Sequence, residues 1–124
     1  MENLLKKAEE ALRYSYSPYS RFKVGATLMA KDGRVFTGCN IENIAYSATI
    51  CAERVAFSKA ISEGVTDFKA IAIVNGNKTA CPPCGECRQV MSEFCEEDFM
   101  IILADKTFTL KELMPESFAI EEMY

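Results

Sequence analysis

Apolar and charged positions alternate with helical spacing near the start of the chain. The apolar positions are Leu4, Leu5, Ala8, Ala11 and Leu12. This spacing predicts an amphipathic helix, which Pro18 separates from the next element. Residues 22–30 and 35–39 are rich in strand-forming residues. The Asp32-Gly33 pair between them favours a hairpin closed by a type I′ turn.

The rest of the chain alternates between helical and strand patterns. Residues 40–50 include several polar side chains, among them Asn40, Glu42, Asn43, Ser47 and Thr49, and indicate a loop. The pattern beyond this loop predicts helices over residues 51–63, 84–95 and 110–114, and strands over residues 68–74, 99–103 and 106–109. This order predicts an α/β fold in which helices cover one mixed sheet.

Length and charge narrow the class of protein. A chain of 124 residues fits one domain, over residues 1–124. Fourteen basic and eighteen acidic side chains give a net charge of −4, which argues against a partner that is nucleic acid or an anionic membrane. No apolar run is long enough for a transmembrane helix. The N-terminal segment also lacks the apolar stretch of a secretory signal.

Two facts of composition bear on chemistry. The chain has no histidine, which excludes Ser-His and Cys-His nucleophile pairs and histidine-based zinc proteases. It has six cysteines: Cys39, Cys51, Cys81, Cys84, Cys87 and Cys95. Without a secretory signal, metal or redox chemistry is the stronger interpretation of these cysteines, and a disulfide framework the weaker one.

The spacing of three cysteines points to a metal site. If Pro83 occupies the first helical position, Cys84 and Cys87 share the first turn and one face of a helix. Cys51 opens the preceding helix, so two helix N-termini could direct three thiols at one place. The positive ends of those helices favour thiolate, the form that binds metal. Zinc is the metal we expect on three sulfur ligands in a reducing compartment.

The cysteine spacing leaves other kinds of site open. Cys81 forms a second C-x-x-C with Cys84, so a structural zinc site with four cysteine ligands is one alternative. A thioredoxin-like dithiol is another. The two prolines after Cys81 favour leaving this residue out of the site. We expect Cys39 and Cys95 to be buried free thiols.

Glu53 lies two residues after Cys51. Positions i and i+2 do not share a face of a regular helix, so both can reach one metal only if Cys51 is a cap residue with non-helical geometry. Three thiolates, an open fourth position and a nearby carboxylate are typical of catalytic zinc. The carboxylate could then take a proton from the attacking water.

Longer motifs resemble a known family. Cys51-Ala52-Glu53 and the segment from Pro83 to Cys87 fit the all-cysteine form of the zinc-deaminase signature. Residues 16–26, 38–43, 51–54 and 83–90 resemble the short, homotetrameric cytidine deaminases. The resemblance covers roughly residues 12–120. It implies a single-domain, three-layer α/β fold with a mixed five-stranded sheet and helices on both faces.

The resemblance also assigns roles around the metal. It implies that Cys51, Cys84 and Cys87 hold one Zn²⁺ per subunit, with Glu53 as proton shuttle. The reaction implied is hydrolytic deamination of cytidine and 2′-deoxycytidine to uridine and 2′-deoxyuridine plus ammonia, as in pyrimidine salvage. We expect such an enzyme to be cytoplasmic, because thiol ligands suit a reducing compartment.

A further set of residues is implied to contact the nucleoside. Asn40 and Glu42 would grip the ribose hydroxyls, and Phe22 would stack on the pyrimidine. Ala52 and Tyr46 would line the pocket. In a homotetramer with shared sites, Phe118 would pack over the site of a neighbouring subunit.

The charge of the metal centre suggests two more residues. Three thiolates leave a zinc site net negative, and two arginines lie near the ligands in the sequence: Arg54 three residues after Cys51, and Arg88 directly after Cys87. Together with the helix ends, they could offset that charge.

The competing hypotheses are a zinc deaminase for another base or for a nucleoside antibiotic such as blasticidin S, and a non-catalytic zinc or thiol-redox module.

Overall fold

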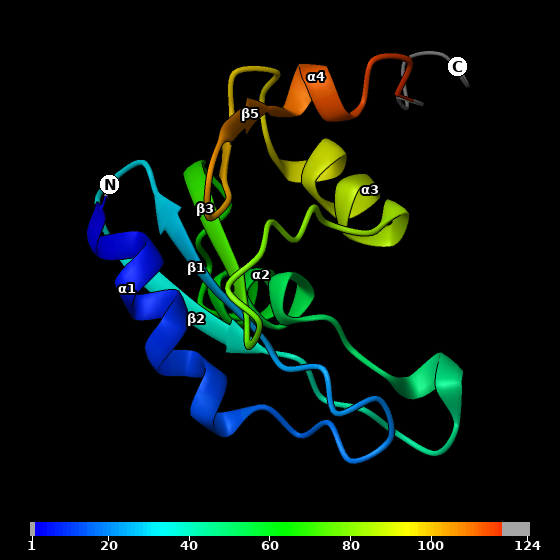
Figure 1. Ribbon diagram of the computed structural model, residues 1–124. Helices are drawn as coiled ribbons and strands as arrows, with labels where there is room; N and C mark the ends of the chain where they lie inside the picture. Colours follow the sequence, from blue (N-terminus) through cyan, green and yellow to red (C-terminus); the bar gives the residue numbers. More distant parts are fainter. Residues whose placement is uncertain (1, 118–124) are drawn as a thin grey trace.

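The computed structural model describes residues 2–117, and over this range the chain forms one five-stranded mixed sheet with helices on both faces (Figure 1). The strand order is β2-β1-β3-β4-β5. The strands are β1 (Val24–Ala30), β2 (Val35–Cys39), β3 (Phe68–Asn75), β4 (Met100–Ile102) and β5 (Thr107–Thr109). The α-helices are α1 (Glu2–Ala11), α2 (Ala52–Ser62), α3 (Gly85–Phe94) and α4 (Leu110–Leu113). Two 3-10 turns cover Leu12–Tyr14 and Tyr46–Ala48.

The expected elements are all present, within a few residues of the expected bounds. The sheet is mixed because β1 runs antiparallel to both neighbours whereas β3 and β4 are parallel. The prediction of a type I′ turn at Asp32-Gly33 is wrong. Of its two central residues only Gly33 has a positive φ, of +94°, and the backbone N–H of Gly33 donates to the carbonyl of Ala30. This is the longer hairpin loop that ends in one left-handed residue.

Helix α1 covers one face of the sheet. Leu4 and Ala8 are fully buried, while the charged positions between them face solvent, as the helical spacing predicts. On the central strand β3, Ala70 and Ala72 belong to the same buried cluster as Leu4. Gly25 lets the helix approach closely, because a Cβ at this position would lie 2.2 Å from the carbonyl oxygen of Ala8.

Helices α2 and α3 cover the opposite face. Ile71 and Ile73 alternate with the alanines of β3 and pack into the larger cluster with Phe57 of α2 and Met91 of α3. The end of β2 lies against the start of α2. A Cβ on Gly38 would lie only 2.3 Å from the carbonyl oxygen of Ala52. The sheet therefore fixes where α2 begins, and this is the end of α2 that carries the candidate site.

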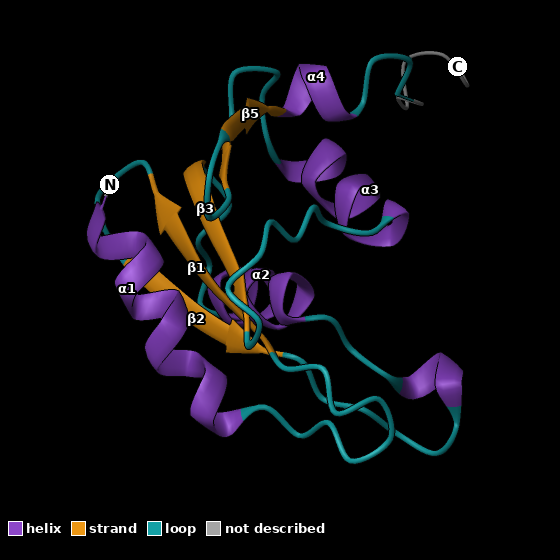
Figure 2. Cartoon of the chain, in the orientation of Figure 1, coloured by secondary structure: helices purple, strands orange, loops and turns teal. Residues whose placement is uncertain are grey.

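Two long connections extend beyond the sheet (teal in Figure 2, apart from the short purple 3-10 turn Tyr46–Ala48). One spans residues 15–23 and the other residues 40–51. They lie side by side, because Ile41 of the second forms a bridge with Tyr16 of the first; a further bridge, between Ile41 and Ile50, folds the second connection back on itself. No helix within residues 2–117 is long and apolar enough to cross a membrane.

Candidate active site

The two helices on the second face bring three thiols together. Cys51, Cys84 and Cys87 offer sulfur atoms that all lie within 4.8 Å of one another. The Sγ of Cys84 lies 3.7 Å from that of Cys51 and 3.5 Å from that of Cys87. Cys87 is buried, Cys51 half-buried and Cys84 exposed, so the group opens to solvent on one side.

Helix capping explains how these thiols meet. Cys51 is the N-cap of α2 and Cys84 the N-cap of α3, and both have extended backbone angles. The expected cap geometry of Cys51 is thus confirmed. Pro83 does not occupy the first helical position, because α3 begins at Gly85 and the proline precedes the cap. Both thiols extend from the positive end of a helix.

The geometry fits a zinc ion. Tetrahedral zinc with sulfur ligands at about 2.3 Å places those sulfurs about 3.8 Å apart, close to the separations of Cys84 from Cys51 and from Cys87. Cys81 does not belong to the three-thiol group, so the structure does not support the four-cysteine alternative. Glu53 does not belong to it either. Three protein ligands leave the fourth position open, as in catalytic sites.

Electrostatics at the thiols favour the anionic form of Cys51. The pKa of Cys51 is lowered to about 5, first by a hydrogen bond with Cys87 and then by the guanidinium of Arg54. The pKa of Cys87 is raised by the same contact with Cys51 and by burial. The pair therefore holds a shared negative charge, which a divalent cation would neutralise.

Glu53 is a buried carboxyl beside the thiols. Its exposed fraction is 4%. It follows Ala52 in the first turn of α2. Burial raises the pKa of Glu53 to about 7, and the charge of Cys51 adds to that rise. A carboxyl with a pKa near neutrality can accept and return a proton at physiological pH.

A cavity of about 190 Å³ adjoins the thiols. It is lined by Val24, Asn40, Glu42, Thr49, Ile50, Cys51, Ala52, Glu53, Cys81, Pro82 and Cys84. Asn40, Glu42, Ala52 and Glu53, which the sequence motifs singled out, thus face the same space as two thiols. Thr49, Ile50 and Pro82 were not singled out, because only the path of the loops brings them here.

Asn40 and Glu42 also hold the loop opposite them in place. The side chain of Asn40 accepts hydrogen bonds from the backbone N–H of Val24 and from Ser15, and donates to the carbonyl of Phe22 at 2.8 Å. Glu42 accepts from the backbone N–H groups of Tyr19 and Ser20 and from the Ser20 hydroxyl. The Ser20 hydrogen bond is the main reason that the pKa of Glu42 is lowered. These contacts build the cavity wall, a role the sequence did not reveal.

Three other candidates lie away from this cavity or outside the described residues. Phe22 is 39% exposed and is not among the lining side chains. Tyr46 is 90% exposed. It lines a separate, outer cavity on the other side of Cys51 and Cys84. Phe118 lies outside residues 2–117, so its predicted contact is not described.

The two arginines differ in what they contact. Nη2 of Arg54 lies 3.8 Å from the Sγ of Cys51. Arg88 instead donates to the carbonyl of Pro83 at 2.8 Å and to that of Leu113 at 3.1 Å. Arg88 therefore ties the start of α3 to the end of α4. Of the two arginines, it is Arg54 whose guanidinium contacts a thiol.

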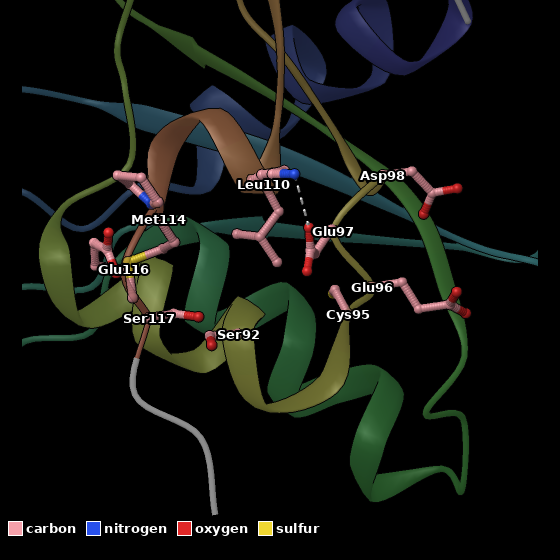
Figure 3. A pocket seen from close by; sticks show the side chains of 11 residues that line it. Ser92, Cys95, Glu96, Glu97, Asp98, Leu110, Met114, Glu116 and Ser117 are labelled. Carbon is pink, nitrogen blue, oxygen red and sulfur yellow. Dashed lines mark ion pairs between the residues drawn. The ribbon is translucent and has the colours of Figure 1, made fainter. Parts of the chain in front are cut away.

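A larger cavity, of about 810 Å³, lies at the other end of α3 (Figure 3). Its wall carries the carboxylates of Glu96, Glu97, Asp98 and Glu116. Lys111, the cation in this wall, pairs with Glu97 at 3.7 Å. Cys95 also lines this wall, where burial raises the pKa of its thiol to about 12. This cavity therefore lacks the three-thiol group that makes the smaller cavity the candidate active site.

Comparison with known proteins agrees with this geometry. The profile of the family described as "Cytidine and deoxycytidylate deaminase zinc-binding region" matches residues 1–103. The chain belongs to the cytidine deaminase family. A cytidine deaminase of Halalkalibacterium halodurans is 49% identical, over 97% of this chain and 95% of the relative. Another, from Sporosarcina psychrophila, is 44% identical over 99% of this chain and 94% of that relative.

Solved structures of the family have the same fold. The crystal structure of cytidine deaminase from Mycobacterium tuberculosis superposes with a TM-score of 0.90 at 39% identity, and covers 96% of this chain and 97% of that one. A cytidine deaminase structure from Burkholderia pseudomallei superposes with a TM-score of 0.89 at 39% identity, and covers 94% of this chain and 98% of that one. The three-layer, five-stranded fold expected from the sequence is confirmed.

Proposed function

We propose that the chain, as one catalytic domain over residues 1–124, hydrolyses cytidine and 2′-deoxycytidine to uridine and 2′-deoxyuridine, with release of ammonia, in pyrimidine salvage. The observation that carries this proposal is the open three-thiol group with the buried carboxyl of Glu53 beside it, in one cavity with Asn40 and Glu42. Relatives named cytidine deaminase, similar over nearly the whole chain, support the choice of substrate.

Cys51, Cys84 and Cys87 would hold the zinc ion. Bound zinc supplies a water activated for attack at neutral pH. The thiols contribute the negative charge that retains the ion, and the two helix N-termini and Arg54 limit that charge. The exposed side of the group faces the cavity, where the pyrimidine would lie.

Glu53 would move the protons of the reaction. Its carboxylate takes a proton as water adds to C4 of the base, and returns it to N3. It then carries the second proton of that water to the amino group, which leaves as ammonia. The pKa near 7 suits both directions of transfer. Because Glu53 is buried, bulk water does not compete for the proton.

The nucleoside would be held by residues of the cavity wall and the loops. Glu42 presents a carboxylate and Asn40 an amide, and these can bind the ribose hydroxyls. The buried Ala52 would place its backbone against the base. Phe22 and Tyr46, both exposed, would complete the pocket by stacking on the base and covering the outer side.

We further propose that copies of this chain assemble, as a homotetramer with shared sites. The support is a set of large apolar side chains exposed on the two long connections and the 3-10 turns: Tyr14, Tyr16, Tyr19, Phe22, Ile41, Ile44, Tyr46 and Ile50. Large apolar side chains exposed on two neighbouring connections favour an interaction surface there. In such an assembly Phe118 would reach a neighbouring site.

We place the protein in the cytoplasm. The support is that all six cysteines are free, including the three at the candidate zinc site. Free thiols in a ligand role persist in a reducing compartment.

Replacement of Glu53 by Gln tests the mechanism. The amide keeps the size of the side chain but cannot accept a proton, so zinc should stay at one per chain while kcat for cytidine falls roughly 10²- to 10⁴-fold. The measurements are ultraviolet absorbance of cytidine and zinc content on one sample. Glu63→Gln, at the exposed end of the same helix, is the matched control. A near-normal rate in Glu53→Gln would contradict the mechanism. Zinc without turnover of cytidine in the wild-type protein would contradict the substrate.

A further inference from the structure

The guanidinium of Arg54 is held at both of its ends. Nη2 donates to the carbonyl of Thr49 at 3.4 Å and lies 3.8 Å from the Sγ of Cys51. Nη1 lies 3.3 Å from a carboxylate oxygen of Glu86. Glu86 sits in the first turn of α3, between Cys84 and Cys87. The ion pair therefore joins the two helices that carry the three thiols.

An exposed ion pair by itself contributes little to stability, and the Glu86 side chain is 77% exposed. Its partner, however, is only 26% exposed, and Nε of Arg54 is buried with no hydrogen-bond partner among the described residues. The orientation of this guanidinium therefore depends on its Nη contacts. Of those, the Thr49 carbonyl is uncharged and the Cys51 sulfur belongs to the thiol group, which leaves the Glu86 carboxylate as the charged partner outside that group.

There is room for the guanidinium to leave this position. The outer cavity beside it has a volume of about 380 Å³ and is bounded by Tyr46, Ser47, Thr49, Cys51, Arg54, Cys84, Gly85 and Glu86. Without an anchor on Nη1, Arg54 could extend into this space and lose its contact with Cys51.

We propose that Glu86 is a positioning residue: its carboxylate anchors Nη1 of Arg54, so that Nη2 stays against the sulfur of Cys51. This inference rests on the proposed zinc site. Three thiolates around a divalent cation carry one net negative charge, which the nearby guanidinium compensates. Arg88 does not replace Arg54 in this role, because its hydrogen bonds go to the carbonyls of Pro83 and Leu113.

The position of Glu86 predicts which quantities change. Glu86 lines the outer cavity and not the one that would hold the nucleoside. Its loss should therefore lower kcat and leave KM for cytidine nearly unchanged. It should also speed the loss of zinc to a chelator, since the sulfur of Cys51 is then less shielded from solvent protons.

A double-mutant cycle tests the inference on the zinc-loaded protein. The variants are Glu86→Ala, Arg54→Ala and the double variant, with Glu86→Gln as the neutral substitute and Glu93→Ala, exposed on the same helix, as the control. The readouts are kcat and KM for cytidine, and the rate of zinc transfer to 4-(2-pyridylazo)resorcinol. If Arg54→Ala does not fold, Arg54→Gln takes its place in the cycle.

We expect Glu86→Ala to lower kcat and to raise the zinc-transfer rate by roughly 3- to 10-fold, a usual coupling for residues in contact. In the Arg54→Ala background the same substitution should change neither. Glu86→Gln should change kcat and the zinc-transfer rate less than Glu86→Ala does, because its amide oxygen can still accept a hydrogen bond from Arg54. Equal effects of Glu86→Ala in both backgrounds, or an effect no larger than that of Glu93→Ala, would overturn the inference.

The outcome is separable from that of the proposed function. Zinc content and cytidine turnover of the wild-type protein decide the proposed function. The zinc-transfer limb of the cycle decides the role of Glu86 even if cytidine proves not to be the substrate.

Discussion

The contact between β2 and the start of α2 places the catalytic end of that helix, and Gly38→Ala perturbs it directly. A Cβ at position 38 would lie 2.3 Å from the carbonyl oxygen of Ala52 and 2.7 Å from the backbone nitrogen of Ala56. Both atoms belong to the helix backbone, so no side-chain rotation can relieve the overlap. An ordinary contact begins at about 3.4 Å, and α2 must therefore move away from the sheet by about 1 Å.

This displacement should affect both stability and catalysis. Overpacking of this kind costs about 1–3 kcal/mol of unfolding free energy. Cys51 and Glu53 lie at the displaced end of the helix. Because a misplacement of about 1 Å can cost roughly 10²-fold in rate, we expect kcat/KM for cytidine to fall by about that factor. Zinc content should fall as well, because Cys51 moves relative to Cys84 and Cys87.

The assay is urea unfolding together with cytidine turnover and zinc content, all on samples loaded with zinc by the same procedure. Gly76→Ala is the control, because a Cβ there meets only the Cβ of Lys23 at 3.8 Å. That control should change the free energy of unfolding by less than about 0.5 kcal/mol. Full stability and full activity of Gly38→Ala would refute the packing argument. Lower stability with unchanged zinc and unchanged kcat/KM would refute the link between helix position and chemistry.

Three further substitutions test the ligand set and the cavity wall. Cys84→Ser should lose zinc whereas Cys81→Ser should keep one zinc per chain, as measured by metal analysis of the purified variants; loss of zinc from both variants would restore the four-cysteine alternative. Asn40→Ala should lower the free energy of unfolding by about 1–3 kcal/mol, because the hydrogen bonds that the buried Asn40 side chain makes to the backbone of Val24 and Phe22 are lost. It should also speed proteolytic cleavage between residues 15 and 24, and unchanged cleavage would show that this loop does not depend on Asn40.

Much of the candidate site follows from local sequence, and these parts were predictable for physical reasons. The spacing of Cys84 and Cys87 is one helical turn, so their proximity follows from helix geometry alone. The position of Glu53 two residues after Cys51 already required an extended cap at Cys51, and the structure has it. The alternation of buried and charged positions likewise determined that α1 lies on the sheet with Leu4 inward.

Residue type alone did not predict a side chain's contacts where its partners come from distant parts of the chain. Arg54 follows Cys51 by three residues and Arg88 follows Cys87 directly, yet of these two arginines it is Arg54 whose guanidinium contacts a thiol. The difference arises because α4 supplies a carbonyl to Arg88, whereas α3 supplies Glu86 to Arg54. Neither contact is visible in a local pattern, since each partner comes from another element of the chain.

The sequence by itself therefore determined the elements, the pairing of Cys84 with Cys87 and the place of Glu53 beside Cys51, because these depend on neighbours within one or two helical turns. Tertiary structure decided that Cys51 meets Cys84 and Cys87, that Asn40 and Glu42 brace the opposite loop, and that Tyr46 lies at the outer cavity. Those outcomes depend on how two long loops and two helix ends converge. That convergence is set by close packing at glycines such as Gly38 and by buried hydrogen bonds between distant segments.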